Sequence, residues 1–173
     1  LGHPRLSVVA FVAVLVHSFS HSLMKCLLFM SAGAVMQATG TKNIEALGAL
    51  AKKMPWTAVF TLVGSMSLAS LPFTSGLVGE WLTLQGLITL AWQAGSQEMR
   101  LLVIAAFILL GLTGALALGC FVRLFGVVFL GRRRSSAVLK AKESPISMRL
   151  GMGMEAVIII ILGIFPAPLT ALM

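Results

Sequence analysis

The chain has 173 residues, of which 58% are hydrophobic and 10% are charged, and its formal net charge is +8 at pH 7. This composition excludes an ordinary water-soluble domain and predicts an all-α protein embedded in a membrane. The positive charge does not indicate nucleic-acid binding, because most of the basic residues lie in two segments between apolar runs, without interleaved aromatic residues. The chain begins with Leu1 and its last apolar run reaches Met173, so we expect a fragment of a longer chain.

The first apolar run covers about residues 6–38 and predicts the first membrane span. It is longer than the roughly 20 residues that a bilayer needs, so the helix should tilt or protrude at one end. The loop that follows, residues 39–55, holds three lysines against one glutamate and therefore has a net charge of +2.

Residues 56–92 are mostly apolar, too many for one straight span, and they include no hydrophilic loop that would allow two. Residues 72–76 interrupt this run: Pro72 removes a backbone donor and clashes with the preceding turn, and Gly76 can take φ values closed to other residues. We therefore predict one discontinuous span, made of two half-helices joined by a break at membrane depth. Irregular backbone at that depth needs protein or water around it.

The remaining apolar runs predict a third span over about residues 101–130 and a fourth over about 150–165, with a neutral loop at 93–100. The loop at 131–149 holds six basic residues against one glutamate, a net charge of +5. If residues 56–92 cross the membrane once, both basic loops lie on the same side. The positive-inside rule makes that side the cytoplasm.

Three ionisable residues, His17, His21 and Lys25, follow one another at four-residue spacing inside the first apolar run. On an α-helix they share one face, each about 6 Å beyond the last. A charge at the bilayer centre costs roughly 2.5–3.5 kcal/mol, so such a stripe has to face protein or water. We interpret the three residues as a buried proton relay, whose surroundings favour neutral forms that exchange protons readily. In the simpler interpretation Lys25 snorkels and the histidines make structural hydrogen bonds.

Two histidines one turn apart also suit a metal ion, as in HExxH zinc sites. Here, however, Ser18 stands where that motif has its general-base glutamate, and the only other histidine is His3. We therefore expect no metal site. Nothing in the sequence suits a flavin, an iron–sulfur cluster or nickel, so we expect no cofactor on this chain.

Glu80 is the only charged residue in the run from 56 to 92, and it follows the predicted break closely. Backbone groups freed at the break, and water held there, can solvate a carboxylate, so we interpret Glu80 as a fourth relay residue. The simpler interpretation pairs Glu80 with a cation on another subunit. Glu155 lies within about a turn of the second basic loop, and we interpret it as an interfacial anchor.

Four segments carry a resemblance to a known family: HSFSHSLMKCLLFMSAGAV, TGTKNIEALGAL, LASLPFTSGLVGEWL and FVRLFGVVFLGRRRS. They are similar to the antiporter-like membrane subunits of respiratory complex I, Mrp sodium/proton antiporters and membrane-bound hydrogenases, above all to the branch of hydrogenase-4 component B and formate hydrogenlyase subunit 3. The resemblance implies that His17, His21 and Lys25 belong to a central polar axis across the membrane. It places Glu80 beside the broken helix of a second half-channel, and it makes this chain the C-terminal part of the subunit, without the first half-channel.

The function implied by the resemblance is proton translocation in a bacterial or archaeal cytoplasmic (inner) membrane. The chain would belong to a redox-driven hydrogenase or NADH dehydrogenase-like complex. Its partners would be other membrane subunits, a peripheral redox arm reached through them, and lipid. Two alternatives remain open: a membrane anchor that moves no ions, and a cation/proton antiporter without redox partners.

Overall fold

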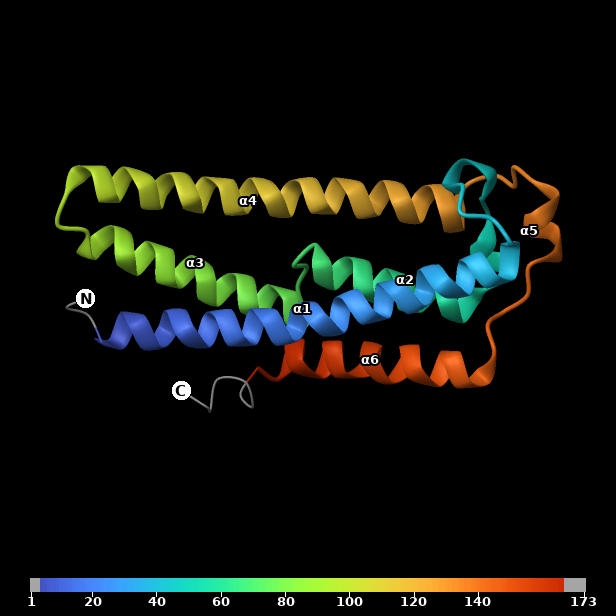
Figure 1. Cartoon of the computed structure of the whole chain (residues 1–173), viewed down its shortest axis with the longest axis horizontal. Helices are drawn as coiled ribbons and strands as arrows, with labels where there is room; N and C mark the ends of the chain where they lie inside the picture. The colour runs from blue at the N-terminus through green and yellow to red at the C-terminus, as the bar shows by residue number, and fades with distance from the viewer. Residues whose placement is uncertain (1–3, 167–173) are drawn as a thin grey trace.

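The computed structural model describes residues 4–166, and over this range it contains helices and no β-strand. Figure 1 shows the helices arranged as an elongated bundle. In chain order the elements are α1 (Pro4–Thr39), the short 3-10 turns η1 (Ile44–Ala46) and η2 (Leu50–Lys52), α2 (Pro55–Leu68), α3 (Ser75–Gln93), α4 (Gln97–Phe125) with its π-helical continuation η3 (Gly126–Leu130), α5 (Ser136–Lys140) and α6 (Ile146–Ile164). The predicted all-α fold is confirmed.

Three helices within the described range are long and apolar enough to cross a membrane: Ser7–Thr39, Gln97–Leu130 and Ile146–Ile164. They correspond to the first, third and fourth spans expected from the sequence. The last helix begins at residue 146 rather than near residue 150, directly after Pro145. Proline is compatible with a helix start because the first backbone N–H groups of a helix have no intrahelical partner.

The helices α2 and α3 confirm the predicted discontinuous helix. In Figure 1 they follow one another across the bundle, and together they extend about as far as α4. The break between them covers residues 69–74, slightly before the predicted 72–76, and Pro72 lies within it. Neither half-helix alone appears among the spans named above. That the two together cross the membrane once stays a prediction.

The prediction that Gly76 supplies an unusual backbone conformation is wrong. Gly76 lies in the first turn of α3, and the positive φ values of the break belong to Ser70 (52°) and Phe73 (68°). Gly76 is needed for space instead, because a Cβ atom added there would collide with the carbonyl oxygen of Ser67 at the end of α2. The two half-helices therefore meet where a glycine is required.

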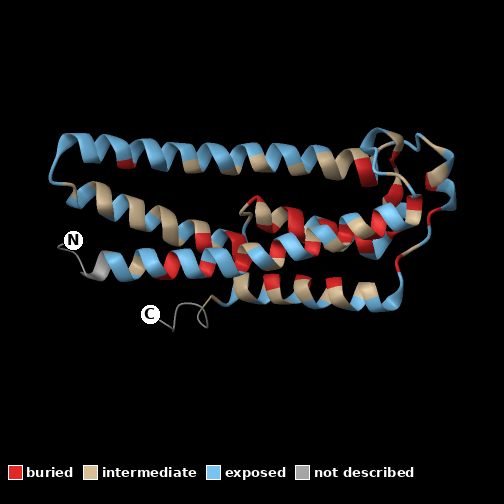
Figure 2. Cartoon of the chain, in the orientation of Figure 1, coloured by how far each residue is buried: buried red, intermediate tan, exposed pale blue. Residues whose placement is uncertain are grey.

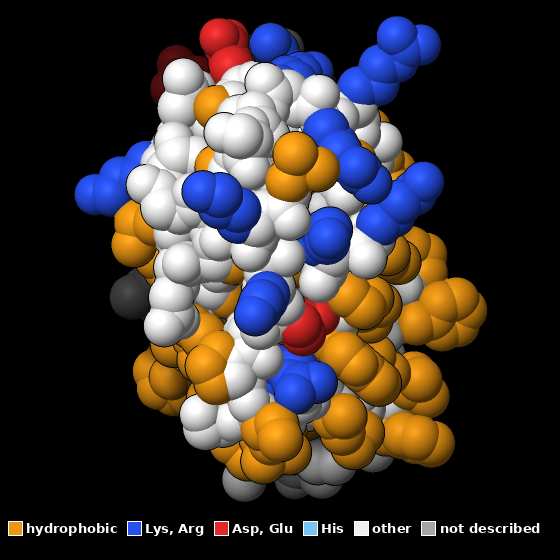
Figure 3. All heavy atoms as spheres, turned by 90° about the vertical axis from the view of Figure 1, so that its right-hand side faces the viewer, with side chains coloured by type: hydrophobic (Ala, Val, Ile, Leu, Met, Phe, Trp, Pro, Cys, Tyr) orange, Lys and Arg blue, Asp and Glu red, His pale blue; other side chains and the backbone are white. Residues whose placement is uncertain are grey.

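Both basic loops lie at the same end of the bundle, as the charge pattern predicts (Figure 1). They are in contact, since a Cβ atom added at Gly48 in the first loop would collide with the carbonyl oxygen of Arg132 in the second. Figure 3 shows this end face on, with Lys and Arg side chains spread over it. The neutral connection between α3 and α4 lies at the opposite end.

The helix α1 is the centre of the packing and contacts α2, α3 and α6. Most buried apolar side chains form one cluster, whose members include Met24, Leu27, Met54, Phe129 and Ile159. Helix α4 contributes little to this core, and Figure 2 shows it exposed along most of its length. Its outward Leu, Ile and Phe side chains suit contact with lipid or with further membrane helices.

Candidate functional site

The predicted stripe of ionisable residues lies in the middle of α1, which is helical throughout. The imidazole rings of His17 and His21 stack, with ring centroids 5.8 Å apart and planes inclined by 23°. Lys25 lies about one turn further along the same face. The three residues His17, His21 and Lys25 therefore form one row along α1, as their spacing predicts, and this row is the ladder.

The burial expected for this ladder is not observed within the chain. His17 and Lys25 are exposed and His21 is half-buried. The packed face of α1 is the neighbouring stripe, in which Ser20 and Met24 are buried. One residue turns the helix by about 100°, so the ladder lies at the edge of the packed face, where the helices of this chain do not cover it.

His17 contacts the half-helix that carries Glu80. A Cβ atom added at Gly79 would lie 3.0 Å from both the Cα and the Nδ1 of His17. Gly79 thus lets α1 and α3 approach closely, and Glu80 is the next residue of α3. The structure brings the start of the ladder and the predicted carboxylate to the same helix contact.

Glu80 itself is half-buried, and its carboxylate faces α4. A Cβ atom added at Gly114 would lie 3.3 Å from Glu80 Oε1. Among the described residues, no hydrogen bond or salt bridge joins Glu80 to the ladder. A proton that passes between them therefore needs an intermediate group or a bridging water.

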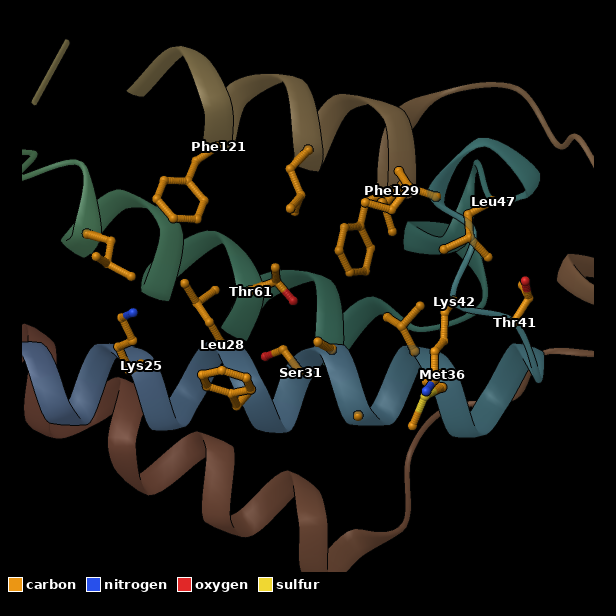
Figure 4. A pocket seen from close by; sticks show the side chains of 18 residues that line it. Lys25, Leu28, Ser31, Met36, Thr41, Lys42, Leu47, Thr61, Phe121 and Phe129 are labelled. Atoms are coloured by element: carbon orange, nitrogen blue, oxygen red, sulfur yellow. The ribbon is translucent and has the colours of Figure 1, made fainter. Parts of the chain in front are cut away.

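Lys25 borders an apolar groove of about 610 Å³. The groove lies between α1, α2 and the end of α4, with Phe121 and Phe129 on the α4 side and Lys25 and Lys42 toward its two ends (Figure 4). Lys25 therefore has apolar neighbours but remains accessible from outside this chain.

The break is enclosed by protein at its end, where Thr74 is buried, whereas Pro72 and Phe73 are exposed. The backbone N–H of Gly76 donates to Ser67 Oγ over 3.3 Å, and Thr74 Oγ1 donates to the Leu71 carbonyl over 2.7 Å. On the α6 side, Gly163 lies so close to the backbone of Thr74 that a Cβ atom would not fit. Irregular backbone at membrane depth requires such an enclosure.

Glu143, in the second basic loop, has a structural role that the sequence did not indicate. Its Oε2 accepts from the Trp56 N–H over 2.8 Å, and its Oε1 accepts from the Thr57 hydroxyl over 2.6 Å and from the Ser144 N–H over 3.0 Å. Glu143 thereby caps the N-terminus of α2. Burial acts to raise the pKa of Glu143, but the bonds from Thr57, Ser144 and Trp56 outweigh it and lower the pKa below its ordinary value of 4.5.

The interpretation of Glu155 as an interfacial anchor does not fit the structure. Because α6 begins at Ile146, Glu155 lies in the middle of the helix. It is half-buried, and its Oε2 is enclosed without a hydrogen-bond partner among the described residues. An enclosed carboxylate in a membrane span is a candidate for an ion pathway. The sequence contained this signal, but the expected helix start was too late to reveal it.

A family model described as "NADH:quinone oxidoreductase/Mrp antiporter, TM" matches residues 5–109, which include the ladder, the break and Glu80. This match covers more than half of the chain, so the chain belongs to this family of antiporter-like membrane subunits. The resemblance inferred from the sequence is confirmed.

Two curated relatives come from Escherichia coli (strain K12). Hydrogenase-4 component B is 36% identical over 164 residues, and formate hydrogenlyase subunit 3 is 37% identical over 164 residues. The alignments cover 95% of this chain but only 24% and 27% of these relatives. The chain therefore spans about a quarter of their length.

Two solved structures share the fold. The membrane-bound sulfane sulfur reductase, an archaeal respiratory membrane complex, matches with a TM-score of 0.75 and 27% identity over 90% of this chain and 24% of that chain. The Mrp complex from Dietzia sp. DQ12-45-1b matches with a TM-score of 0.71 and 18% identity over 91% of this chain and 35% of that chain. The predicted fold class, a polytopic helical part of a larger membrane subunit, is confirmed.

Proposed function

We propose that this chain is part of a subunit that translocates protons across a membrane, and that His17, His21, Lys25 and Glu80 carry them. The observation that carries the proposal is the contact between His17 and Gly79, which joins the ladder on α1 to the half-helix bearing Glu80. Membership of a family described by NADH:quinone oxidoreductase and Mrp antiporter supports it. A membrane anchor that moves no ions would not need a row of ionisable residues in its spans.

The geometry suggests a role for each residue. An imidazole accepts a proton at one ring nitrogen and releases another from the second. The rings of His17 and His21 stack without a hydrogen bond between them, so a proton passes from one to the other along α1 through a bridging water. Lys25 holds a proton on its amine at the open groove. Glu80 takes up and releases a proton between α3 and α4, beside Gly114.

In this proposal the redox centres belong to other subunits, and no cofactor binds to this chain. The partners are further membrane subunits, a peripheral redox arm reached through them, and lipid against the exposed side of α4. The complex lies in a bacterial or archaeal inner membrane, with the loops 39–55 and 131–149 in the cytoplasm. The printed names of the two Escherichia coli relatives, a hydrogenase component and a formate hydrogenlyase subunit, support a place in such a complex.

A second candidate function is the exchange of a cation for protons without redox partners. It is favoured by the family description, which includes Mrp antiporters. Both candidates use the same four residues. Proton flux that follows an added electron donor favours the redox-driven complex, whereas flux that follows a sodium gradient favours exchange.

Substitution of Lys25 in the full-length subunit tests the proposal. We expect Lys25→Ala to lower proton pumping by membrane vesicles at least about tenfold, and Lys25→Arg to restore little, because a guanidinium does not release its proton near neutral pH. Single His17→Ala and His21→Ala variants should lose less, since water can bridge one missing group. Lys42→Ala is the matched control, because Lys42 borders the same groove at its other end. Normal pumping by an assembled Lys25→Ala complex would support the anchor instead.

A further inference from the structure

Two glycines of α3, Gly76 and Gly79, show which residues of α1 and α3 lie opposite one another. His17 lies against Gly79, as described above, and a Cβ atom added at Gly76 would lie 3.3 Å from the Met24 methyl group. Moving forward along α1 from His17 to Met24 therefore means moving backward along α3. The two helices run antiparallel, and the residues between His17 and Met24 face the first turn of α3 (Figure 1).

Two serines occupy this contact, one from each helix. Ser20 lies three residues after His17 and four before Met24, on the same packed stripe of α1. Ser75 is the first residue of α3 and lies four residues before Gly79, so it shares the face that meets α1. Both side chains have 0% exposure, and neither hydroxyl has a hydrogen-bond partner among the described residues.

Two unsatisfied hydroxyls in the same helix contact require an explanation, because buried polar groups in folded proteins are almost always hydrogen-bonded. Most other buried serines and threonines in membrane helices of this chain follow that rule, and among the described residues Ser65 of α2 is an exception. Ser31, equally enclosed on α1, donates to the Leu27 carbonyl over 2.8 Å. Ser20 and Ser75 therefore lack the bond that Ser31 makes, and they lie on the two helices, α1 and α3, that contact each other here.

The chemistry around the two hydroxyls favours water over a metal cation. They lie at the N-terminus of α3, where Thr74 provides no side-chain cap; the Gly76 N–H donates to Ser67 Oγ, and the other N–H groups of the first turn have no partner within the helix. The positive end of a helix dipole disfavours a cation there. Water accepts from such N–H groups while it donates to or accepts from a serine hydroxyl.

We infer that Ser20 and Ser75 hold an ordered water between α1 and α3, and that this water links the ladder to Glu80. Ser20 precedes His21 directly, and Ser75 begins the helical turn that leads to Gly79 and Glu80. Ser75 lies five residues before Glu80, about 7.5 Å along α3 and on a different face, so further waters are needed to complete the path from this water to the carboxylate. The two serines are positioning residues: they orient the water and do not themselves change protonation state. The transport role of the water rests on the proposed function, whereas the binding site does not.

A cryo-electron microscopy map of the full complex, at a resolution that shows ordered water, tests the site. We expect density within about 3 Å of both Ser20 Oγ and Ser75 Oγ. Direct bonding of the two hydroxyls to each other or to protein groups, with no density between them, would overturn the inference.

Proton flux in the same complex tests the role. Ser20→Ala and Ser75→Ala should each lower the flux by a similar factor of about ten, and the double variant should lose little more, because both changes remove the same water. Ser20→Thr keeps a hydroxyl and should retain the flux. Ser31→Ala is the matched control, since it removes an equally buried but already bonded hydroxyl on the same helix. Normal flux in Ser20→Ala, alongside lost flux in Lys25→Ala, would overturn this inference and leave the proposed function standing.

Discussion

At the scale of single residues, Glu143 joins two parts of the chain that are far apart in sequence. Its carboxylate accepts from Trp56 and Thr57, 87 and 86 residues away, and so holds the second basic loop against the N-terminus of α2. Removing a side-chain cap from a helix costs typically about 1 kcal/mol. We expect Glu143→Gln to lower the thermal stability of the subunit by an amount of this order at neutral pH.

This contribution should depend on pH in a defined direction. The pKa of Glu143 is lower in the folded protein than its ordinary value of 4.5, so its stabilisation is fully present above that value. It is lost as the pH falls through the pKa of the folded state. Melting curves of the wild type and Glu143→Gln should therefore converge under acid conditions. Glu45→Gln, an exposed change in the first basic loop, is the control. A constant difference in Tm down to about pH 3 would contradict the proposed cap.

The ladder and Glu143 differ in how much of their structural role could be predicted from the sequence. Four-residue spacing alone predicted that His17, His21 and Lys25 share a face, because helix geometry is local. Their exposure was not predictable, since it depends on which neighbouring stripe of α1 packs against the other helices. The role of Glu143 had no local signal, because its partners lie at the start of a different helix.

At the scale of elements, the break between α2 and α3 was predictable from the sequence. The residues that take its unusual backbone angles, and the reason for a glycine at position 76, were not. Pro72 marked the interruption, because proline cannot continue a helix without losing a hydrogen bond. The sequence suggested that Gly76 takes the unusual backbone angles, yet Ser70 and Phe73 do so. The need for glycine at residue 76 comes from the Ser67 carbonyl at the end of α2, a tertiary contact without a sequence pattern.

We therefore expect Gly76→Ala to disturb the break by pushing α3 away from α2. Forcing an extra methyl group into a packed site typically costs about 1–3 kcal/mol, and proton flux should fall with it. Gly86→Ala, in the same helix, is the matched control, because a Cβ atom there meets nothing within 4 Å. That change should be neutral or slightly stabilising, since alanine favours helix over glycine by roughly 0.5–1 kcal/mol. Comparing thermal stability and proton flux of the two variants checks this; equal behaviour would contradict the tight contact at residue 76.

The break and Glu80 should also act as one unit. We expect Glu80→Gln to add little to the loss caused by Pro72→Ala combined with Gly76→Ala, because both changes disable the same step. Residues that act together give strongly non-additive losses in a double-mutant cycle on proton flux. Simple additivity would show that the break and the carboxylate serve separate purposes.

At the scale of the whole molecule, the charge pattern predicts the orientation in the membrane. Single cysteines at the exposed positions 52, 133 and 97, in a variant without Cys26 and Cys120, report the sides of the three loops. A membrane-impermeant maleimide added to intact spheroplasts should label Gln97→Cys at once. It should label Lys52→Cys and Arg133→Cys only after permeabilisation. Labelling of residues 52 and 133 from opposite sides would mean that residues 56–92 cross twice.

The arrangement of spans followed from hydropathy and charge, and both basic loops do lie at one end of the bundle (Figure 1). The broad exposure of α4 was less predictable, because apolar residues in a membrane span face lipid and protein alike. The chain spans about a quarter of the length of its Escherichia coli relatives.

The central claim is that the ladder and Glu80 belong to one proton path. The most direct test measures initial rates of proton uptake by vesicles that carry the full-length complex with Lys25→Ala, Glu80→Gln or both. We predict that each single change lowers the rate at least about tenfold and that the double variant is no slower than the slower single one. Wild-type rates in either single variant, with the complex assembled in normal amount, would contradict the account.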